Sequence, residues 1–213
     1  MKRLYVIGDS ISIQYGPYLE RYLAGRMVYA RKGHEDTAAL ALDPPQSANG
    51  GDSSMVLAFV SAKAAASGFA ADVALLNCGL WDLRADPQTG AKQVPVTQYG
   101  ANLAEIVDIL HAEGVAVAWV RTTPCDEAVH NKREMGFHRY AADVVAYNEA
   151  ADAVMSAHNV PTLDLHTFTL NLGDNLYCDH VHSNEHVREK QAAFIAGWLA
   201  AWDAVSRKGA SGG

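Results

Sequence analysis

The feature that most constrains the fold is a regular alternation of short apolar runs with longer segments of helical periodicity. The apolar runs are nearly continuous in hydrophobicity, as expected of strands that are covered on both faces of a parallel sheet. We predict strands at Leu4–Ile7, Met27–Ala30, Val73–Asn77, Val115–Val120 and Val160–Leu165. Helices are predicted near Ser10–Ala24, Ser53–Ser67, Val96–Ala112, Phe137–His158 and Asn184–Val205.

This rhythm predicts an α/β fold, a three-layer α/β/α sandwich around a five-stranded parallel sheet. Right-handed crossovers place helices on both faces, and a flavodoxin-like strand order is expected. One domain should span residues 1–206, followed by a flexible tail at 207–213. Ligands bind at the carboxyl edge of such sheets. Long connections that follow strands should gather there, at Arg31–Asp52, Leu80–Pro95 and Arg121–Gly136.

Composition argues against several classes of protein. A net charge of −7 over 213 residues provides no basic surface for nucleic acid. No apolar run reaches the roughly 18 residues of a membrane span. Cys78, Cys125 and Cys178 are too few, and odd in number, for a disulfide framework. Because the first strand begins almost at once and leaves no room for a signal peptide, we expect a cytoplasmic protein. The oligomeric state is left open.

Ser10 stands at a junction between a strand and a helix. The first apolar run ends at Gly-Asp-Ser, residues 8–10, and helical periodicity follows directly. A serine there carries its hydroxyl at the carboxyl edge of the sheet. Its backbone N–H lies at the positive end of a helix, where developing negative charge is stabilised. The simpler interpretation is a helix N-cap, in which the serine oxygen only accepts a backbone hydrogen bond.

A second motif, at residues 179–182, places a carboxylate three residues before an imidazole. With a serine, these groups suit acyl transfer: His182 would take the serine proton and Asp179 would hold the imidazole in the correct tautomer. The first and last strands end at the same edge, so Ser10 and His182 can meet there. Taken alone, a histidine before a C-terminal helix is more often a cap or a surface residue.

His180, His182, Glu185 and His186 also invite comparison with a metal site. His182 and His186 are four residues apart, but the order of residues is not His-Glu-x-x-His, and no third ligand is evident. The pairing with Asp179 explains His182 better, so no metal is expected.

Two glycine-containing loops offer donors for an oxyanion. Residues 49–52, Asn-Gly-Gly-Asp, come just before a predicted helix, and glycine there lets the backbone N–H approach a ligand closely. Residues 77–82, Asn-Cys-Gly-Leu-Trp-Asp, follow the third strand and belong to the same edge of the sheet. Each loop taken alone is also compatible with an ordinary turn.

These blocks, in this order, resemble those of the SGNH (GDSL-type) esterase and lipase superfamily. Residues 8–10 match its first block, Gly-Asp-Ser, and residues 51–53 are similar to its second. Residues 79–82, Gly-Leu-Trp-Asp, resemble the third block, Gly-x-Asn-Asp, and Asp179-x-x-His182 matches the fifth. The resemblance spans nearly the whole chain and agrees with the predicted strand and helix rhythm.

The resemblance implies a serine esterase in which Ser10 is the nucleophile, His182 the base and Asp179 its orienting acid. The oxyanion donors would be the backbone N–H groups of Ser10 and Gly51, together with a third-block asparagine side chain. Trp81 occupies that asparagine position. An indole also carries an N–H, but it is bulkier than a carboxamide and has one hydrogen to donate. Trp81 therefore either reaches the oxyanion or forms a wall of the pocket.

The resemblance also implies a small-molecule substrate, an acetyl-type ester of a carbohydrate or related metabolite, and no cofactor. We expect Asp9, Trp81 and Arg84 to contact this substrate. Two other functions remain open. An acyltransferase would use the same residues, with an alcohol in place of water. A catalytically impaired binding protein of the same fold is suggested by the tryptophan at position 81.

Overall fold

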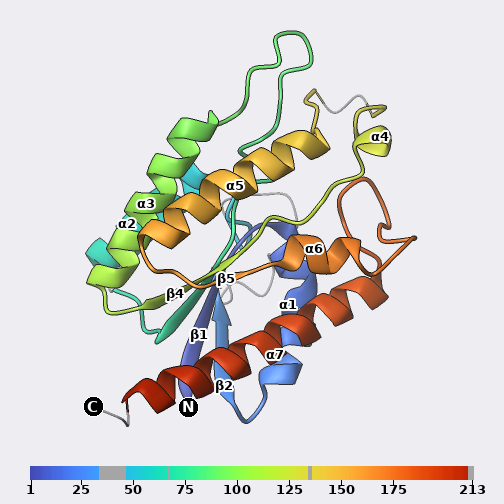
Figure 1. Ribbon diagram of the computed structural model, residues 1–213. Helices are drawn as coiled ribbons and strands as arrows, with labels where there is room; N and C mark the ends of the chain where they lie inside the picture. The colour runs from blue at the N-terminus through green and yellow to red at the C-terminus, as the bar shows by residue number, and fades with distance from the viewer. Residues whose placement is uncertain (34–46, 67, 134–135, 211–213) are drawn as a thin grey trace.

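The computed structural model describes residues 1–33, 47–66, 68–133 and 136–210 (Figure 1). Its strands are β1 (Lys2–Ile7), β2 (Met27–Arg31), β3 (Val73–Leu76), β4 (Ala116–Val120) and β5 (Thr162–Leu163). Its helices are α1 (Ser10–Leu23), α2 (Ser53–Ala66), α3 (Val96–Ala112), α4 (Glu127–His130), α5 (Ala141–Ala157), α6 (Leu165–Leu170) and α7 (Glu185–Ala210). All strands pair in parallel, in the order β2-β1-β3-β4-β5. The predicted flavodoxin-like sheet is confirmed.

Helices cover both faces of the sheet and form the predicted three-layer sandwich (Figure 1). On one face α1 packs against α7, and the short α6 also contacts α7. On the other face α2 packs against α3, which in turn packs against α5. None of the helices in the described part of the chain is long and apolar enough to cross a membrane.

The central strand β3 buries all of its residues, and its neighbours β1 and β4 contribute Leu4 and Trp119, both fully buried. This accounts for the continuous apolar runs in the sequence, because a central parallel strand faces helices on both sides. Removing apolar surface from water stabilises the fold by roughly 25 cal/mol per Å². The core therefore fixes the positions of the strand ends, and with them the loops at the carboxyl edge.

Helix α5 begins at Ala141, four residues later than the sequence predicts. The reason is an antiparallel bridge between His138 and Ala85, in which each backbone N–H donates to the other carbonyl at 2.8 Å. This pairing keeps the chain extended and joins the loops that follow β3 and β4. The long connection after β2 falls largely on residues 34–46, outside the described residues.

β5 is shorter than predicted because a helix begins directly after it. The side chain of Asp164 accepts a hydrogen bond of 3.0 Å from the backbone N–H of Thr167 and caps α6. The last helix is longer than predicted: α7 continues to Ala210, so residues 207–210 of the expected flexible tail are helical. Residues 211–213 lie outside the described residues.

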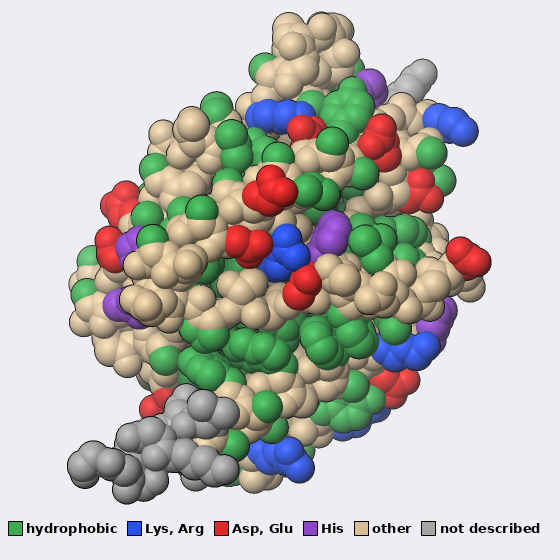
Figure 2. Space-filling model, in the orientation of Figure 1, with side chains coloured by type: hydrophobic (Ala, Val, Ile, Leu, Met, Phe, Trp, Pro, Cys, Tyr) green, Lys and Arg blue, Asp and Glu red, His purple; other side chains and the backbone are tan. Residues whose placement is uncertain are grey.

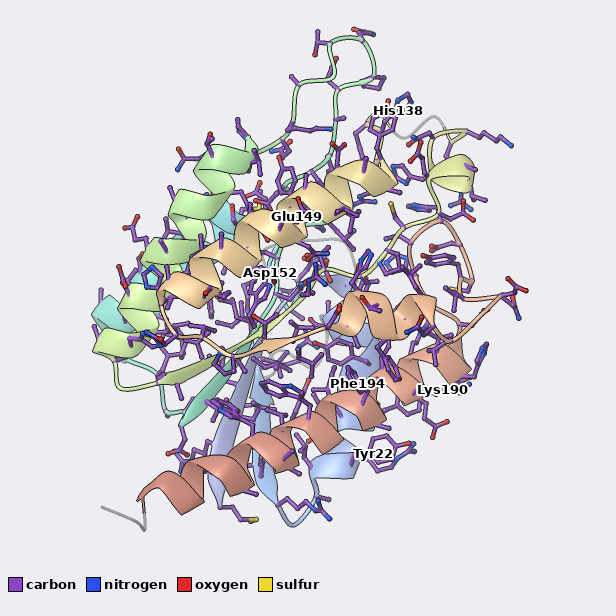
Figure 3. The ribbon with its side chains drawn as sticks, in the orientation of Figure 1. Tyr22, His138, Glu149, Asp152, Lys190 and Phe194 are labelled. Atoms are coloured by element: carbon purple, nitrogen blue, oxygen red, sulfur yellow. The ribbon has the colours of Figure 1, made fainter. Side chains whose placement is uncertain are left out.

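Ion pairs tie the carboxyl end of β4 to its neighbours. Arg121 lies 3.2 Å from a carboxylate oxygen of Asp152 and 3.0 Å from one of Asp164. Figure 3 shows Asp152 and Glu149 along α5, and Figure 2 shows acidic and basic side chains gathered on this face. Such partly exposed pairs contribute at most about 1 kcal/mol each. They help to position the strand end, and the apolar core supplies most of the stability.

Gly79 gives a test of how tightly the loop after β3 is packed. Its φ is 146°, and a β-carbon there would lie 2.5 Å from Oγ1 of Thr122, which donates a hydrogen bond to the Cys78 carbonyl. We expect Gly79→Ala to lower the free energy of unfolding by about 3 kcal/mol, because strained φ and overpacking each cost about 1–3 kcal/mol. Gly90→Ala is the control, since Gly90 also has positive φ but no atom within 4 Å. Urea denaturation showing equal losses would contradict this account.

Candidate active site

Ser10 is the first residue of α1, where β1 ends at the carboxyl edge of the sheet. The N-cap is its neighbour Asp9, whose Oδ1 accepts a hydrogen bond of 3.0 Å from the backbone N–H of Ile11. Because Asp9 caps the helix, the hydroxyl of Ser10 is available for another partner. The interpretation of Ser10 as a simple N-cap is therefore wrong.

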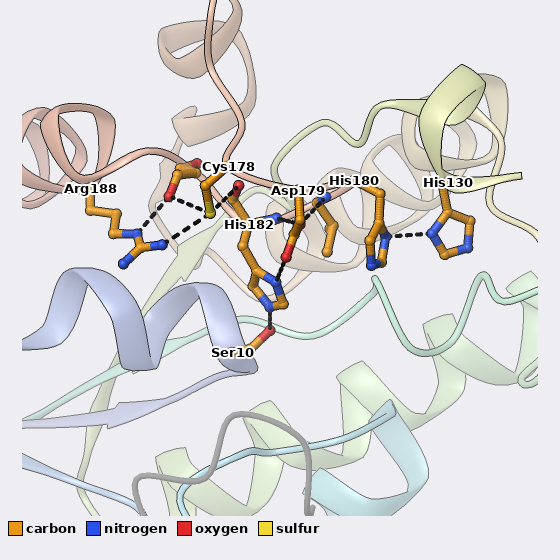
Figure 4. Close-up of polar contacts among 9 residues, drawn as sticks. Ser10, His130, Cys178, Asp179, His180, His182 and Arg188 are labelled. Atoms are coloured by element: carbon orange, nitrogen blue, oxygen red, sulfur yellow. Dashed lines mark hydrogen bonds and ion pairs between the residues drawn. The ribbon is translucent and has the colours of Figure 1, made fainter. Parts of the chain in front are cut away.

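The hydroxyl of Ser10 contacts a histidine that is 172 residues away in the sequence. Nε2 of His182 lies 2.8 Å from Oγ of Ser10, and Nδ1 lies 2.7 Å from Oδ2 of Asp179 (Figure 4). An ionised carboxylate only accepts hydrogen bonds, so Nδ1 carries the hydrogen and Nε2 of the neutral ring is an acceptor. The structure thus brings together the three residues that the sequence singles out, with the imidazole oriented toward the serine proton.

The carboxylate of Asp179 also shapes its own loop. Oδ1 accepts hydrogen bonds from the backbone N–H groups of Val181 (2.8 Å) and His182 (2.7 Å). Burial alone would raise the pKa of the Asp179 carboxyl, but these bonds and the His182 ring outweigh it and lower the pKa to about 2. Asp179 is therefore ionised at neutral pH, as the orientation of His182 requires.

A backbone hydrogen bond joins the two ends of the same loop. The N–H of Cys178 donates to the carbonyl of His182 at 2.9 Å. From the first turns of α7, Arg188 donates to the carbonyl of Ser183 at 2.6 Å and to the sulfur of Cys178 at 3.3 Å (Figure 4). These contacts hold the backbone of the loop that carries His182, and none of them involves its ring nitrogens.

A pair of histidines holds the loop from the side opposite Arg188 (Figure 4). Nδ1 of His180 lies 2.6 Å from Nδ1 of His130, and both side chains are buried. One Nδ1 must donate and the other accept, so at least one ring is neutral. Burial is the main cause of the shift in both pKa values. It lowers the pKa of His180, and it lowers the pKa of His130 to about 4. The backbone N–H of Asp126 adds a bond of 3.0 Å to the His180 carbonyl.

The expected oxyanion donor Gly51 lies in left-handed backbone geometry, with φ of 73°. Its N–H donates to Oδ1 of Asn49 at 2.8 Å, so it already has an acceptor in this structure. Nearby, Oδ1 of Asp82 accepts a hydrogen bond of 2.8 Å from the backbone N–H of Ser53 and so fixes the start of α2. Burial raises the pKa of Asp82 to about 7. The oxyanion role of Gly51 stays a prediction.

A small pocket opens beside the serine and the histidine, walled by the loops that follow β1, β3 and β4 and by the segment between α6 and α7. It is lined by Asp9, Ser10, Leu80, Trp81, Arg84, Phe137, Arg139, His180, Val181 and His182. The expected substrate contacts Asp9, Trp81 and Arg84 are all among them. The guanidinium of Arg84 lies over the Trp81 ring, 3.5 Å from its centroid, and over the Phe137 ring at 4.3 Å.

Sequence reasoning missed Phe137, Arg139 and His130. The expected connection ended at Gly136, and the residues after it were assigned to a helix, whereas the bridge at His138 keeps them at the pocket. Residues 137–140 read Phe-His-Arg-Tyr. A run of aromatic and basic residues directly after a long loop at the carboxyl edge is the signal that could have identified Phe137 and Arg139.

The side chains of the candidate metal group do not converge. His182 contacts Ser10 and Asp179, whereas the carboxylate of Glu185 accepts a hydrogen bond of 2.6 Å from the hydroxyl of Tyr18 on α1. In the part of the chain that the structure describes, no three His, Cys, Asp or Glu side chains are arranged to hold a metal ion.

Comparison with known proteins gives the family. Residues 6–188 match the GDSL-like Lipase/Acylhydrolase family. A solved lipase/acylhydrolase from Enterococcus faecalis superposes with a TM-score of 0.70 at 16% identity, over 93% of this chain and 95% of that chain. An acetyl xylan esterase, AlAXEase, gives 0.68 at 14% identity, over 93% and 98% of the two chains. Esterase EstA from Pseudoalteromonas sp. gives 0.65 at 15% identity, over 95% and 98%. Comparison with curated proteins gives no match.

A flavodoxin-like sheet with serine, histidine and aspartate hydrogen-bonded at its carboxyl edge defines a class of hydrolase. The match over most of the chain identifies the group within that class: the protein belongs to the GDSL-like lipase/acylhydrolase family. It is a carboxylic ester hydrolase.

The buried histidine pair predicts how stability depends on pH. The pKa of His130 is lowered to about 4, so between about pH 6.5 and 4 the unfolded chain binds more protons than the folded one. This site therefore lowers the free energy of unfolding as pH falls, by up to about 1.4 kcal/mol per pH unit. In His130→Asn, which retains a polar group but does not titrate, we expect a smaller loss between pH 6.5 and 4.

Denaturation at several pH values measures this difference between the two proteins. The comparison is necessary because the raised pKa of Asp82 acts in the opposite direction over the same range. A carboxyl whose folded pKa is about 7 destabilises the fold increasingly as pH rises from 4 to 7. Asp82 is present in both proteins, so its contribution cancels, and parallel pH profiles would contradict the prediction.

Proposed function

We propose that this protein is a serine esterase of small acyl esters, with Ser10 as nucleophile, His182 as general base and Asp179 as its orienting residue. The proposal is carried by the continuous chain of hydrogen bonds, 2.8 Å from Ser10 to His182 and 2.7 Å from His182 to Asp179. At these distances a serine proton can pass to an imidazole whose other nitrogen is fixed. We call these three residues the triad.

In the first half of the proposed reaction, Nε2 of His182 takes the proton of Ser10 while Oγ bonds to the ester carbonyl carbon. The carbon–oxygen bond to the alcohol then breaks, and His182 returns the proton to the leaving oxygen. In the second half, water gives a proton to His182 and attacks the acyl-enzyme. The serine oxygen recovers this proton as the carboxylic acid leaves. No cofactor is needed in any step.

Two backbone donors are proposed for the oxyanion. The N–H of Ser10 lies in the first turn of α1, where N–H groups lack helical partners and the helix dipole favours negative charge. The N–H of Gly51 is the second donor, and the oxyanion must share or displace its present hydrogen bond to Asn49. We assign Trp81 to the wall of the pocket, because its ring face is covered by the guanidinium of Arg84.

The proposed substrate is an acetyl-type ester of a carbohydrate or related metabolite. The small size of the pocket beside Ser10, whose lining includes the apolar Leu80 and Val181, supports a short acyl group. The similar fold of an acetyl xylan esterase is consistent with such a substrate. A cytoplasmic location also remains a proposal, and the three free thiols Cys78, Cys125 and Cys178 are compatible with it.

The proposed nucleophile and base can be tested together. A fluorophosphonate should label Ser10, and Ser10→Ala should lose both labelling and ester hydrolysis while keeping its melting temperature. His182→Ala should lower kcat nearly as much, and the double variant should be little worse, because triad members act as a unit. Full activity of Ser10→Ala would refute the proposal. Preferred acyl transfer to an added alcohol over water would indicate an acyltransferase that uses the same residues.

Trp81→Phe tests the role of the tryptophan. If Trp81 is a wall of the pocket, the phenylalanine ring of the variant still covers the guanidinium of Arg84, and kcat should change less than about threefold. Trp81→Ala should mainly alter the preference among p-nitrophenyl esters of different acyl length. If instead the indole N–H donates to the oxyanion, Trp81→Phe should lower kcat by about 10²-fold with nearly unchanged KM. Steady-state kinetics on p-nitrophenyl acetate distinguish the two roles.

A further inference from the structure

We propose that the pocket selects esters that carry an anionic oxygen group, a carboxylate or a phosphate, close to the scissile bond, and that Arg139 and Arg84 bind this group. The inference rests on the proposed esterase function and specifies its substrate class. Arg84 was expected from the sequence to contact substrate, whereas Arg139 emerges only from the structure.

Arg139 is a buried cation at the active site. Arg139 is 4% exposed and lines the pocket together with Ser10 and His182. Its Nε donates to the carbonyl of Leu80 at 2.8 Å. Among the described residues, its terminal amino groups have no hydrogen-bond acceptor and no carboxylate forms an ion pair with it. A buried charge without such a partner is costly, and an anionic ligand in the pocket would remove this cost.

Arg84 brings a second guanidinium to the same pocket. It lies over the rings of Trp81 and Phe137, and Arg139 lies 5.0 Å from the centroid of the same Phe137 ring. Contacts of this kind hold the flat face of a guanidinium against aromatic rings. The N–H groups of a guanidinium project in the plane of the group, in the fork geometry that matches the oxygens of a carboxylate or phosphate.

The carboxylates nearest the pocket do not neutralise Arg139 by contact. Oδ1 of Asp9 accepts the N–H of Ile11, and burial raises the pKa of Asp9, which disfavours its charged form. The oxygens of Asp179 accept from His182 and from two backbone N–H groups. Both carboxylates act on Arg139 only through space. At Arg139, a ligand anion would therefore meet guanidinium N–H groups rather than a completed ion pair.

The test compares anionic esters with neutral esters of similar shape. On the alcohol side, 4-acetoxybenzoate and 4-acetoxyphenyl phosphate are compared with neutral 4-acetoxybenzamide. On the acyl side, ethyl hydrogen glutarate is compared with ethyl pentanoate. For at least one anionic ester we expect kcat/KM to exceed that of its neutral partner by about 10- to 100-fold, the range for hydrogen bonds to a charged group. The substrate that shows the preference identifies the anion and the side of the ester that carries it.

The variants are Arg139→Met and Arg84→Met, with Arg26→Met as the control. Arg26 is exposed just before β2, at the amino ends of the strands. Its loss changes the net charge by the same amount as the loss of Arg139 or Arg84. The anionic preference should fall to near one in Arg139→Met, fall at least threefold in Arg84→Met, and persist in Arg26→Met. A purely structural role for Arg139 would lower the rates of both partners without changing their ratio. If Arg139→Met does not fold, Arg84→Met and Arg139→Gln provide the comparison.

Equal rates within every pair would overturn the inference, as would a preference that survives in Arg139→Met. If neutral esters are hydrolysed by the wild type and not by Ser10→Ala, such a result leaves the esterase function intact. Titration of Ser10→Ala with 4-acetamidobenzoate and its neutral amide, 4-acetamidobenzamide, tests anion binding without turnover. Tighter binding of the acid, lost in Arg139→Met, would support the inference even if no ester is hydrolysed, and equal binding would overturn it.

Discussion

The hydrogen bond between Ser10 and His182 is the interaction on which the rest of the site depends. Its two ends are 172 residues apart in the sequence, and only the folding of the parallel sheet brings them within 2.8 Å. Because β1 and β5 run parallel in one sheet, the segments that follow them emerge at the same edge. The buried core of β1, β3 and β4 therefore provides the precision that a proton transfer between these residues requires.

Different interactions position the two residues of this hydrogen bond. On the serine side, Asp9 caps α1 and leaves the hydroxyl of Ser10 unused by the helix. On the histidine side, the carboxylate of Asp179 accepts both backbone and ring N–H groups, so one residue shapes the loop and orients the imidazole. The buried contact between His130 and His180 joins this loop to the one that follows β4. The wall of the pocket and the position of His182 thus depend on one another.

The pocket also shows how aromatic side chains from two loops hold a cation. Trp81 packs its ring against Arg84, and Phe137 contacts the same guanidinium. An arginine stabilised by aromatic rings and a buried Arg139 give the pocket a positive character that the net charge of −7 does not suggest. Local charge at a site is set by which side chains the fold brings together, and the composition of the chain does not determine it.

The sequence by itself determined the layered fold, the strand order and the three residues of the proposed triad. Apolar periodicity reports burial on both faces of a sheet, and short motifs at strand ends report chemistry, so both are readable locally. The tertiary structure alone decided the start of α5, the length of β5, the acceptor of the Gly51 N–H, and the presence of Phe137 and Arg139 in the pocket. These features depend on contacts between distant segments, such as the bridge between Ala85 and His138, and apolar periodicity does not encode them.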